Sequence, residues 1–507
     1  MGVSFYVTTP IYYVNANPHL GHAYTTIAAD VASRHMRQRG EDVFFLTGTD
    51  EHGSKVARSA AAAGLSPKEF CDQVSAVFRQ LAGDLHATND FFIRTSDAEH
   101  ERFVQAFVER MRASGDVYED TYSGLYCTAC EAFYTDDDLV DGMCPIHGTP
   151  PEWVEEKNWF FRLSAYEDRL LALYDERPEF VLPRARYNEA RSFIEGGLKD
   201  ISLSRDSIEW GVPVPWEPHQ VIYVWIDALL NYTSALTYAR PGEDLTGRYW
   251  PARWQVLGKD ILKFHAVIWP AMLMSAGYEV PHQLLIHGFL TVREAKMSKS
   301  VGNVLDPFRV IERYGLDALR FYLFRDVRFG GDGDVSYDRV HDRFNLELAN
   351  DLGNLLSRTV AMIVRYRDGL APSGAVDPAI RVVLERSATS FAAHVDRFEL
   401  TEALEAAWGS VRALNRFVEE RAPWKLAKDP DASAELDDVL YTLQDGLRVI
   451  AVIVASFVPD AAAAILAAIG SAGSAVSWDN VAPGLLPAGA RAQLDGPLFP
   501  RVDEPLA

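Results

Sequence analysis

Two short segments, far apart in the sequence, carry side chains suited to holding a nucleoside triphosphate. The tetrapeptide HLGH places the imidazoles of His19 and His22 three residues apart, where a helix is expected to begin. Free N–H groups and the positive end of the helix dipole at such an entrance favour phosphate. The pentapeptide KMSKS adds the ammonium groups of Lys296 and Lys299, which are flexible point charges. Together the two segments predict attack on an α-phosphate, with donors and cations neutralising the charge that develops.

Each segment also has a simpler explanation when it is considered alone. His19 could cap the helix while His22 packs against it, and the lysine segment could be a solvated surface loop. Short motifs have a real false-positive rate, so their occurrence together and in this order is what favours the triphosphate site. Gly21 suits that site because it removes a side chain where the backbone would approach the adenine.

The residues around the first segment predict a strand, a helix and a second strand. Residues 5–9 (FYVTT) and 43–46 (VFFL) have the composition of strands. Between them, apolar residues recur at helical spacing from Leu20 to Val31, and Gly40 ends the helix. Such a unit is a right-handed parallel crossover, whose ligand crevice lies beyond the carboxyl ends of the strands. The HLGH segment is therefore expected in that crevice.

The composition changes along the chain and predicts several parts. Segments rich in aromatic residues and cysteine replace the α/β pattern between about residues 116 and 220, and beyond residue 345 the sequence is overwhelmingly helical. The expected fold class is α/β, with an all-α bundle at the C-terminal end. The expected parts are a Rossmann-like parallel-sheet catalytic domain (1–115 and 221–289), a connective insertion (116–220), a linker with the lysine segment (290–345) and the helix bundle (346–507).

Size and charge exclude some classes of protein. With 507 residues, 48% of them hydrophobic, the chain has material for several cores. Its apolar run at residues 449–458 stops at Pro459, well short of the roughly 20 residues that cross a bilayer. The N-terminus lacks the pattern of a secretory leader, so we expect a cytoplasmic protein. The net charge of -22 argues against binding nucleic acid through overall charge, but a local basic face would still serve.

Four potential metal ligands lie close together in the expected insertion. Cys127 and Cys130 are followed after thirteen intervening residues by Cys144 and His147, a spacing typical of a zinc knuckle. Four protein ligands leave no open position, so the zinc would be structural. Reduced thiols without metal are the alternative. The remaining cysteine, Cys71, is expected to be an ordinary buried thiol.

Two trios of residues fall at helical spacing and could form the walls of a slot. Aromatic rings with a small alanine between them suit an unbranched, polarizable thioether. Asp50, which follows the second strand, could receive an α-ammonium group. Aromatic stripes at this spacing are more often plain core, so the pattern alone leaves both explanations open. The trios are Trp225, Ala228 and Tyr232, and Ile261, His265 and Trp269.

In the helical region, three residues have the chemistry to read unpaired nucleotides. Asn354 and Arg358 are four residues apart on one expected helix face, and Pro423-Trp424 interrupts a second helical segment. Unpaired bases can stack on an aromatic ring while Asn and Arg read their edges. Packing on helix surfaces explains the same residues without a nucleic acid.

The HLGH and KMSKS segments resemble the paired signatures of class I aminoacyl-tRNA synthetases. Over nearly its whole length, the chain resembles the methionyl-tRNA synthetases, in a form with enough ligands for a single zinc knuckle. The resemblance implies that L-methionine is activated with ATP and Mg²⁺ to methionyl-adenylate and transferred to the 3′ end of initiator and elongator tRNA(Met). It also implies that Asn354, Arg358 and Trp424 read the CAU anticodon. Leu229 departs from the proline that some members carry after the alanine.

By the same resemblance, His19, His22, Lys296 and Lys299 are catalytic and bind the triphosphate. ATP contacts are also implied for Gly21, Gly258, Asp260 and Leu290. The implied methionine pocket comprises Ile11, Tyr13, Asp50, Trp225, Ala228, Tyr232, Ile261, His265 and Trp269.

Rival classes of protein remain at this point. One is another adenylyl-transferring enzyme on the same fold, such as a nucleotidylyltransferase or a synthetase for another amino acid. The other is a tRNA-binding or zinc-dependent scaffold without catalysis, against which the intact phosphate-binding residues argue. The chain ends soon after the expected bundle, without the module that dimerises some relatives, so we expect a monomer.

Overall fold

The computed structural model describes residues 2–15, 17–127, 132–134, 138–145, 148–292, 295–296, 305–471 and 476–506. The chain divides into two compact units. The sheet unit comprises Ser4–Pro18 and Phe44–Ile286, and the helical unit comprises Met1–Val3, His19–Val43 and His287–Ala507.

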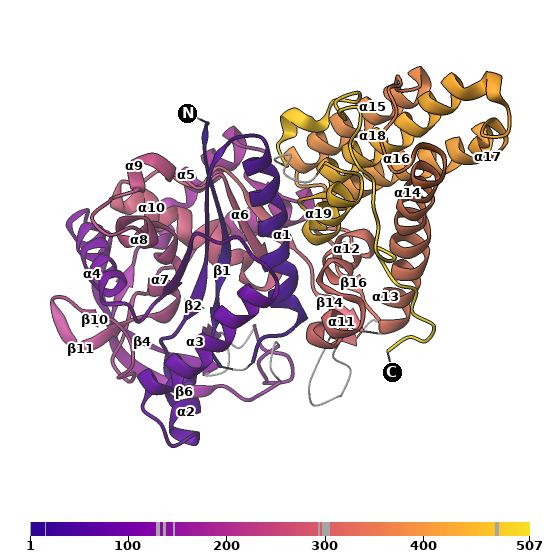
Figure 1. Cartoon of the computed structure of the whole chain (residues 1–507). Coiled ribbons are helices and arrows are strands. Elements are labelled where there is room, and N and C mark those ends of the chain that lie inside the picture. The colour runs from indigo at the N-terminus through magenta and orange to yellow at the C-terminus, as the bar shows by residue number, and fades with distance from the viewer. Residues whose placement is uncertain are drawn as a thin grey trace. The chain divides into compact units, whose positions relative to one another are not determined.

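A six-stranded sheet forms the centre of the sheet unit. Its strands lie in the order β3-β2-β1-β12-β13-β7, and the pairs β2 with β3, β1 with β12 and β13 with β7 are parallel. The strand order reverses between β1 and β12, which is the switch point where ligands bind in such sheets. Figure 1 shows β1 and β2 side by side. The strands are β1 (Ser4–Tyr13), β2 (Asp42–Asp50), β3 (Phe91–Arg94), β7 (Val181–Leu182), β12 (Trp254–Gly258) and β13 (Leu284–His287).

This sheet is buried, as its apolar strand sequences require. Every residue of β2 after Asp42 is buried, whichever face of the strand it occupies. Strands covered on both faces lose the alternation of apolar and polar residues. Tyr6, Phe44 and Trp269 belong to one large hydrophobic core. The helices of this unit before and after the insertion are α2 (Ser54–Ala62), α3 (Pro67–Asp84), α4 (Ala98–Ala113), α7 (Val224–Leu229), α8 (Asn231–Tyr238), α9 (Thr246–Tyr249) and α10 (Trp269–Ala276).

The described part of the expected insertion contains two small sheets and two α-helices. One sheet has the order β5-β4-β6-β8, and the other has the order β10-β11-β9. Strand β7, however, falls within residues 116–220 and pairs with β13 of the large sheet. Two residues give no periodic signal, so composition alone did not separate β7 from the insertion. The elements are β4 (Val117–Cys127), β5 (Ala132–Tyr134), β6 (Glu152–Phe161), α5 (Glu167–Glu176), α6 (Arg184–Glu195), β8 (Ile201–Ser202), β9 (Ser204–Arg205), β10 (Pro213–Val214) and β11 (Glu217–Ile222).

From His287 onward, the helical unit has a small sheet and short helices. Its sheet has the order β15-β14-β16. Local sequence signals set the bounds of helix α11: Asp306 caps it, Pro307 starts it and Gly315 follows its last residue. The elements are β14 (Leu290–Val292), β15 (Ala295–Lys296), α11 (Pro307–Tyr314), α12 (Leu316–Asp326), β16 (Gly333–Asp334), α13 (Tyr337–Arg343), a π-helix (Phe344–Gly353) and α14 (Asn354–Arg367).

Long helices complete this unit and confirm the predicted helical C-terminal region (Figure 1). Asp377 caps α15 with Pro378 at its first turn. Helix α16 ends where Ala422 takes a left-handed conformation before Pro423, whose ring cannot continue the helix. The helices are α15 (Pro378–Asp396), α16 (Leu400–Arg421), α17 (Pro423–Leu426), α18 (Ser433–Val454) and α19 (Pro459–Ala468).

Helix α1 (Leu20–Gln38) packs within the helical unit through a buried ion pair. Arg320 of α12 donates to the Asp30 carboxylate at 2.7 Å, and both side chains are fully buried. The same guanidinium donates to the carbonyls of Ser456 and Phe457, which follow α18. Arg34 of α1 also pairs with this carboxylate at 2.7 Å. Breaking a buried pair by removing one partner costs about 3–5 kcal/mol. The helix that begins at the HLGH segment is therefore fixed to α12 and to the end of α18.

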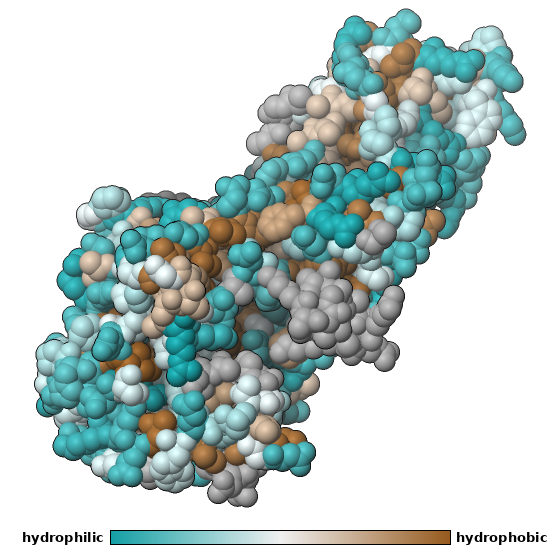
Figure 2. Space-filling view, turned by 90° about the horizontal axis from the view of Figure 1, so that it is seen from below, coloured by the Kyte–Doolittle hydropathy of each residue, from teal (hydrophilic) through white to brown (hydrophobic). Residues whose placement is uncertain are grey.

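The face shown in Figure 2 is mostly hydrophilic, with smaller hydrophobic areas between the polar residues. Among the described residues, no helix combines the length and the apolar character needed to cross a membrane.

Candidate active site

The residues implied to bind methionine all lie in the sheet unit. Ile11 and Tyr13 are at the carboxyl end of β1, and Asp50 is the last residue of β2. The backbone N–H of Val14 donates to the Asp50 carbonyl at 3.2 Å, which joins the two strand ends. These positions are the ones that the parallel crossover predicted for a ligand crevice.

The other pocket residues come from shorter and more irregular helices than the sequence predicted. Trp225 and Ala228 lie in α7, whereas Tyr232 lies in the separate helix α8. Ile261 ends a 3-10 helix, His265 lies in a π-helix, and Trp269 begins α10. The expectation, drawn from their helical spacing, that each trio lines one helix face was therefore wrong.

The irregular backbone before Trp269 has a simple cause. Pro270 has no N–H to donate, so a regular α-helical ladder cannot continue through this turn. The Trp269 N–H instead bonds to the Phe264 carbonyl, five residues back. Turns of this kind occur frequently at functional sites.

His265 is the polar centre of this cluster, and its surroundings keep it neutral. Its Nδ1 lies 3.0 Å from the Ile261 carbonyl, which can only accept, so Nδ1 carries the proton. Nε2 then accepts from the Tyr232 hydroxyl at 2.7 Å. Burial lowers the pKa of His265 to about 4, despite the opposing effect of the bond to Ile261. The Tyr232 ring lies 5.9 Å from that of Trp269, so the trios meet although no single helix aligns them.

Trp225 is held by a residue that sequence reasoning missed. Its ring stacks on Phe264 with the centroids 3.9 Å apart and the planes 14° apart. Ala228, also on α7, is buried. Phe264 adjoins His265 in the sequence, but an apolar residue in a helical stretch gives no signal that it supports a pocket ring.

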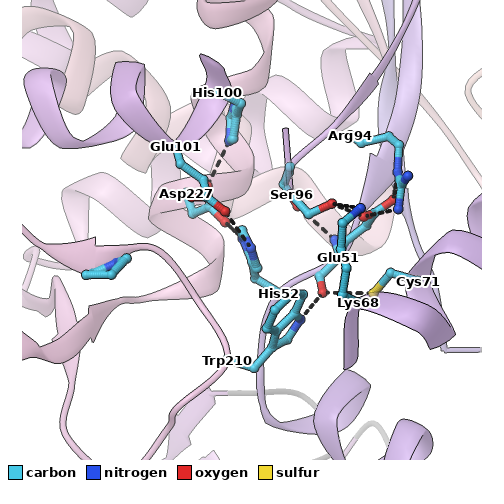
Figure 3. A network of polar contacts seen from close by, with 12 residues as sticks. Glu51, His52, Lys68, Cys71, Arg94, Ser96, His100, Glu101, Trp210 and Asp227 are labelled. Atoms are coloured by element: carbon cyan, nitrogen blue, oxygen red, sulfur yellow. Dashed lines mark hydrogen bonds and ion pairs between the residues drawn. The ribbon is translucent and has the colours of Figure 1, made fainter. Parts of the chain in front are cut away.

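Asp50 is followed by Glu51, whose side chain is tightly fixed. The Glu51 carboxylate is fully buried and accepts two bonds from Arg94, at 2.7 and 2.9 Å. Ser96 and Thr49 also donate to it, at 2.5 and 2.8 Å. Figure 3 shows Arg94 and Ser96 directed at this carboxylate. A bidentate arginine pair inside the protein gives a defined geometry, so the Asp50 backbone has a rigid neighbour.

The HLGH segment starts a helix as predicted, and its two histidines cap that helix. His19 Nδ1 accepts from the Gly21 N–H at 3.1 Å, and His22 Nδ1 accepts from the His19 N–H at 3.0 Å. In the neutral rings the proton is therefore on Nε2, and the ring centroids are 3.8 Å apart. A Cβ at position 21 would lie 2.9 Å from the His19 ring, so Gly21 is required for this arrangement. The two histidines thus cap the helix through Nδ1 and also present two Nε2–H donors.

The remaining ATP residues are divided between the units. Gly258 ends β12 and Asp260 follows it in the sheet unit, whereas Leu290 starts β14 in the helical unit. The backbone of Lys296 lies in β15. Lys299 falls outside the described residues.

Two of the four expected zinc ligands are described. Cys127 and Cys144 are buried and form no disulfide. Cys127 Sγ lies 3.8 Å from the Thr149 hydroxyl, and the Cys144 N–H donates to the Thr149 carbonyl at 2.9 Å. Both cysteines thus contact Thr149, Cys127 through its thiol and Cys144 through its backbone, and two soft donors fit zinc. Cys130 and His147 fall outside the described residues, and the residues that the structure does describe contain no group of three candidate ligands.

Arg358 and Trp424 lie close together in the helical unit. The Arg358 guanidinium lies 6.0 Å from the centre of the Trp424 ring and pairs with Glu419 at 2.6 Å. The Trp424 side chain is 36% exposed. Asn354 is exposed one turn before Arg358 on α14, as predicted. We call the surface formed by Asn354, Arg358 and Trp424 the α14–α17 face.

The parallel sheet, the histidine-capped helix and the helical C-terminal region define a class I aminoacyl-tRNA synthetase. The family model described as tRNA synthetases class I (M) matches residues 5–149 and 137–360. A second, described as the anticodon binding domain of methionyl tRNA ligase, matches residues 371–505. The chain belongs to the methionine–tRNA ligase family.

Individual relatives and solved structures agree with this assignment. The methionine–tRNA ligase of Caldanaerobacter subterraneus subsp. tengcongensis is 44% identical over 99% of this chain and 80% of its own length. That of Brucella suis is 43% identical over 99% of this chain and 98% of its own. The structure of Mycobacterium tuberculosis methionyl-tRNA synthetase in complex with methionyl-adenylate has a TM-score of 0.94 and 42% identity. It covers 98% of this chain and 100% of its own.

Proposed function

We propose that the buried cluster of the sheet unit selects the substrate when this chain makes methionyl-adenylate from L-methionine and ATP. The observation that carries the assignment is the bond from the Tyr232 hydroxyl to neutral His265, next to Trp269. A charged imidazole would disfavour an apolar side chain, whereas a neutral one leaves aromatic edges for a thioether. Asp50 receives the substrate ammonium.

In the chemical step, a methionine carboxylate oxygen bonds to the α-phosphorus of ATP. The bond from that phosphorus to the oxygen bridging it to the β-phosphorus breaks, and pyrophosphate leaves. Mg²⁺ bound to the phosphates would neutralise part of their charge. His19 and His22 donate from Nε2 to phosphate oxygens, and Lys296 and Lys299 neutralise the charge of the leaving group. Gly21, Gly258, Asp260 and Leu290 hold the nucleoside. The adenylate then passes methionine to the 3′ end of tRNA(Met).

We assign anticodon reading to the α14–α17 face. An exposed indole offers a stacking surface to an unpaired base, and the adjacent guanidinium and amide can read base edges. Initiator and elongator tRNA(Met) share the CAU anticodon, so one surface serves both.

Zinc is proposed as a structural ion held by Cys127, Cys130, Cys144 and His147. A closed tetrahedral site would stabilise the connective insertion and take no part in the reaction. Metal analysis of the purified protein should find one zinc per chain. Substituting Cys144→Ser should remove it, whereas Cys71→Ser should not.

The decisive test is exchange of labelled pyrophosphate into ATP without tRNA, across a panel of amino acids. Methionine alone should stimulate exchange, and stimulation by cysteine or isoleucine instead would overturn the pocket. His22→Ala and Lys299→Ala should each slow methionine-dependent exchange about 100-fold or more. Lys263→Ala, an exposed lysine outside the proposed site, is the matched control and should retain activity.

We also propose that the protein works as a monomer in the cytoplasm, where translation consumes its product. Sedimentation should give a mass near 56.5 kDa. A mass near twice that value would contradict the proposal.

A further inference from the structure

His52, His100 and Asp227 form a buried polar cluster (Figure 3). The Asp227 carboxylate accepts from His52 Nδ1 at 2.7 Å and from His100 Nε2 at 2.8 Å. His100 Nδ1 lies 2.7 Å from the Ser234 hydroxyl. All four side chains are buried, and Asp227 and His100 are fully so.

His52 lies between two carboxylates on different helices. Its Nδ1 bonds to Asp227 of α7, and its Nε2 lies 3.8 Å from Glu101 of α4. The Trp210 ring meets it edge-on at 5.3 Å, and Glu51 precedes it in the chain. Burial lowers the pKa of His52, but the charge and hydrogen bond of Asp227, followed by Glu101 and Glu51, outweigh burial and raise that pKa above its ordinary value. The environment thus favours the imidazolium.

The bond between His52 and Asp227 joins two parts of the pocket that are 175 residues apart in sequence. His52 is two residues after Asp50, the proposed ammonium ligand. Asp227 lies in α7 between Trp225 and Ala228, which form a pocket wall. Nothing in the proposed chemistry uses His52, Asp227 or Glu101 directly.

We propose that His52 is a positioning residue for methionine selection, joining the Asp50 segment to α7 as a cation through its bond to Asp227. This inference rests on the proposed function. Loss of the proton would leave the Asp227 charge less neutralised inside the protein. The distance between Asp50, the ammonium ligand, and the pocket wall on α7 would then be held less firmly. Methionine binding would weaken, while the ATP site would be unaffected.

His52→Asn tests the charge, because its amide can still donate from near the Nδ1 position but carries no proton to lose. The KM for methionine in pyrophosphate exchange should rise about tenfold, which corresponds to about 1.4 kcal/mol. Both kcat and the KM for ATP should stay within about twofold. In the wild type the KM for methionine should also rise at alkaline pH as His52 loses its proton. This alkaline limb of the pH profile should be absent from His52→Asn. Titration of the substrate's own ammonium affects both proteins alike.

Glu101→Gln is the sharper variant, because Glu101 is partly exposed and does not bond to Asp227. It should lower the pKa of His52 and move the alkaline limb to lower pH, with the KM below that limb unchanged. His35→Asn is the matched control for replacing a buried imidazole by an amide. Burial lowers the pKa of His35 to about 3, so its loss removes no charge and should leave the KM profile unaltered.

Three results would overturn the inference. They are an unchanged KM for methionine in His52→Asn, an alkaline limb that Glu101→Gln does not move, and equal losses of kcat and of affinity for both substrates. If wild-type protein itself shows no methionine-dependent exchange, the proposed function has failed instead.

Discussion

The proposed methionine pocket and the α14–α17 face are built in opposite ways. Tyr232 and Trp269 are fully buried in the pocket, whereas Trp424 is 36% exposed on the face. The charges behind the pocket are buried and paired, as at Asp227, while Arg358 pairs with Glu419 at the surface. The difference follows from what is recognised. A free amino acid must be enclosed and separated from water, whereas a base can be stacked only on a ring left open.

The largest expected effect comes from removing the carboxylate that two histidines share. Asp227→Ala should lower the free energy of unfolding by about 3–5 kcal/mol, because His52 and His100 lose their buried partner. Glu419→Ala, which breaks the surface pair of Arg358, should change it by no more than about 1 kcal/mol. Urea titrations of both variants measure this contrast, and equal losses would contradict it.

A buried carboxyl in the helical unit tests whether burial gives an ionisable group a large effect on stability in that unit as well. Burial raises the pKa of Asp317 to about 6, against the opposing bond from the Ala461 N–H and the charge of Arg320. Its Oδ1 has no partner among the described residues and can carry a proton. A raised folded pKa means that the contribution of this group to stability is complete below its unfolded pKa and is lost as the pH rises through about 6.

Asp317→Asn keeps the acceptor for Ala461 but cannot titrate. The unfolding free energy of the wild type, relative to this variant, should therefore fall by about 2–3 kcal/mol between pH 4 and pH 8. Urea titrations across that range check the slope. A constant difference would show that the carboxyl does not titrate in the folded protein.

Trp424→Ala should separate the two regions functionally. Loss of base stacking costs about 1–3 kcal/mol, so kcat/KM for tRNA(Met) should fall roughly 10- to 100-fold. Methionine-dependent pyrophosphate exchange without tRNA should not change. Trp153→Ala, which removes another exposed indole, is the matched control and should retain charging activity. A fall in exchange activity would contradict the separate roles of the face and the pocket.

The smallest expected effect is inside the pocket. Tyr232→Phe removes the hydroxyl that donates to His265 Nε2, a loss of about 1 kcal/mol. The KM for methionine should rise about fivefold, and charging kinetics with respect to tRNA should be unaltered. Activation assays with varied methionine measure this change. An effect on the KM for tRNA alone would show that Tyr232 does not line the pocket.

Some local elements were predictable because their signals are local. The caps and prolines at the start of α11 and the HLGH entrance to α1 act on neighbouring residues, so their boundaries follow from sequence. The pocket helices were predicted wrongly because the i, i+4, i+8 spacing of Ile261, His265 and Trp269 also fits a 3-10 turn followed by a π-helix. Pro270, which has no N–H to donate, was the sequence signal that a regular helix could not continue through this segment.

The sequence by itself determined the chemistry: the phosphate-binding residue types, the candidate metal ligands, and the division into an α/β part and a helical part. Only the tertiary structure decided that His265 is neutral, and that His52, His100 and Asp227 share one buried cluster. The hydrogen bonds that join Asp227 to His52 and His100 connect residues 175 and 127 positions apart. Periodicity and short motifs report only on neighbours, so the charge of a side chain becomes known when the folded chain shows what surrounds it.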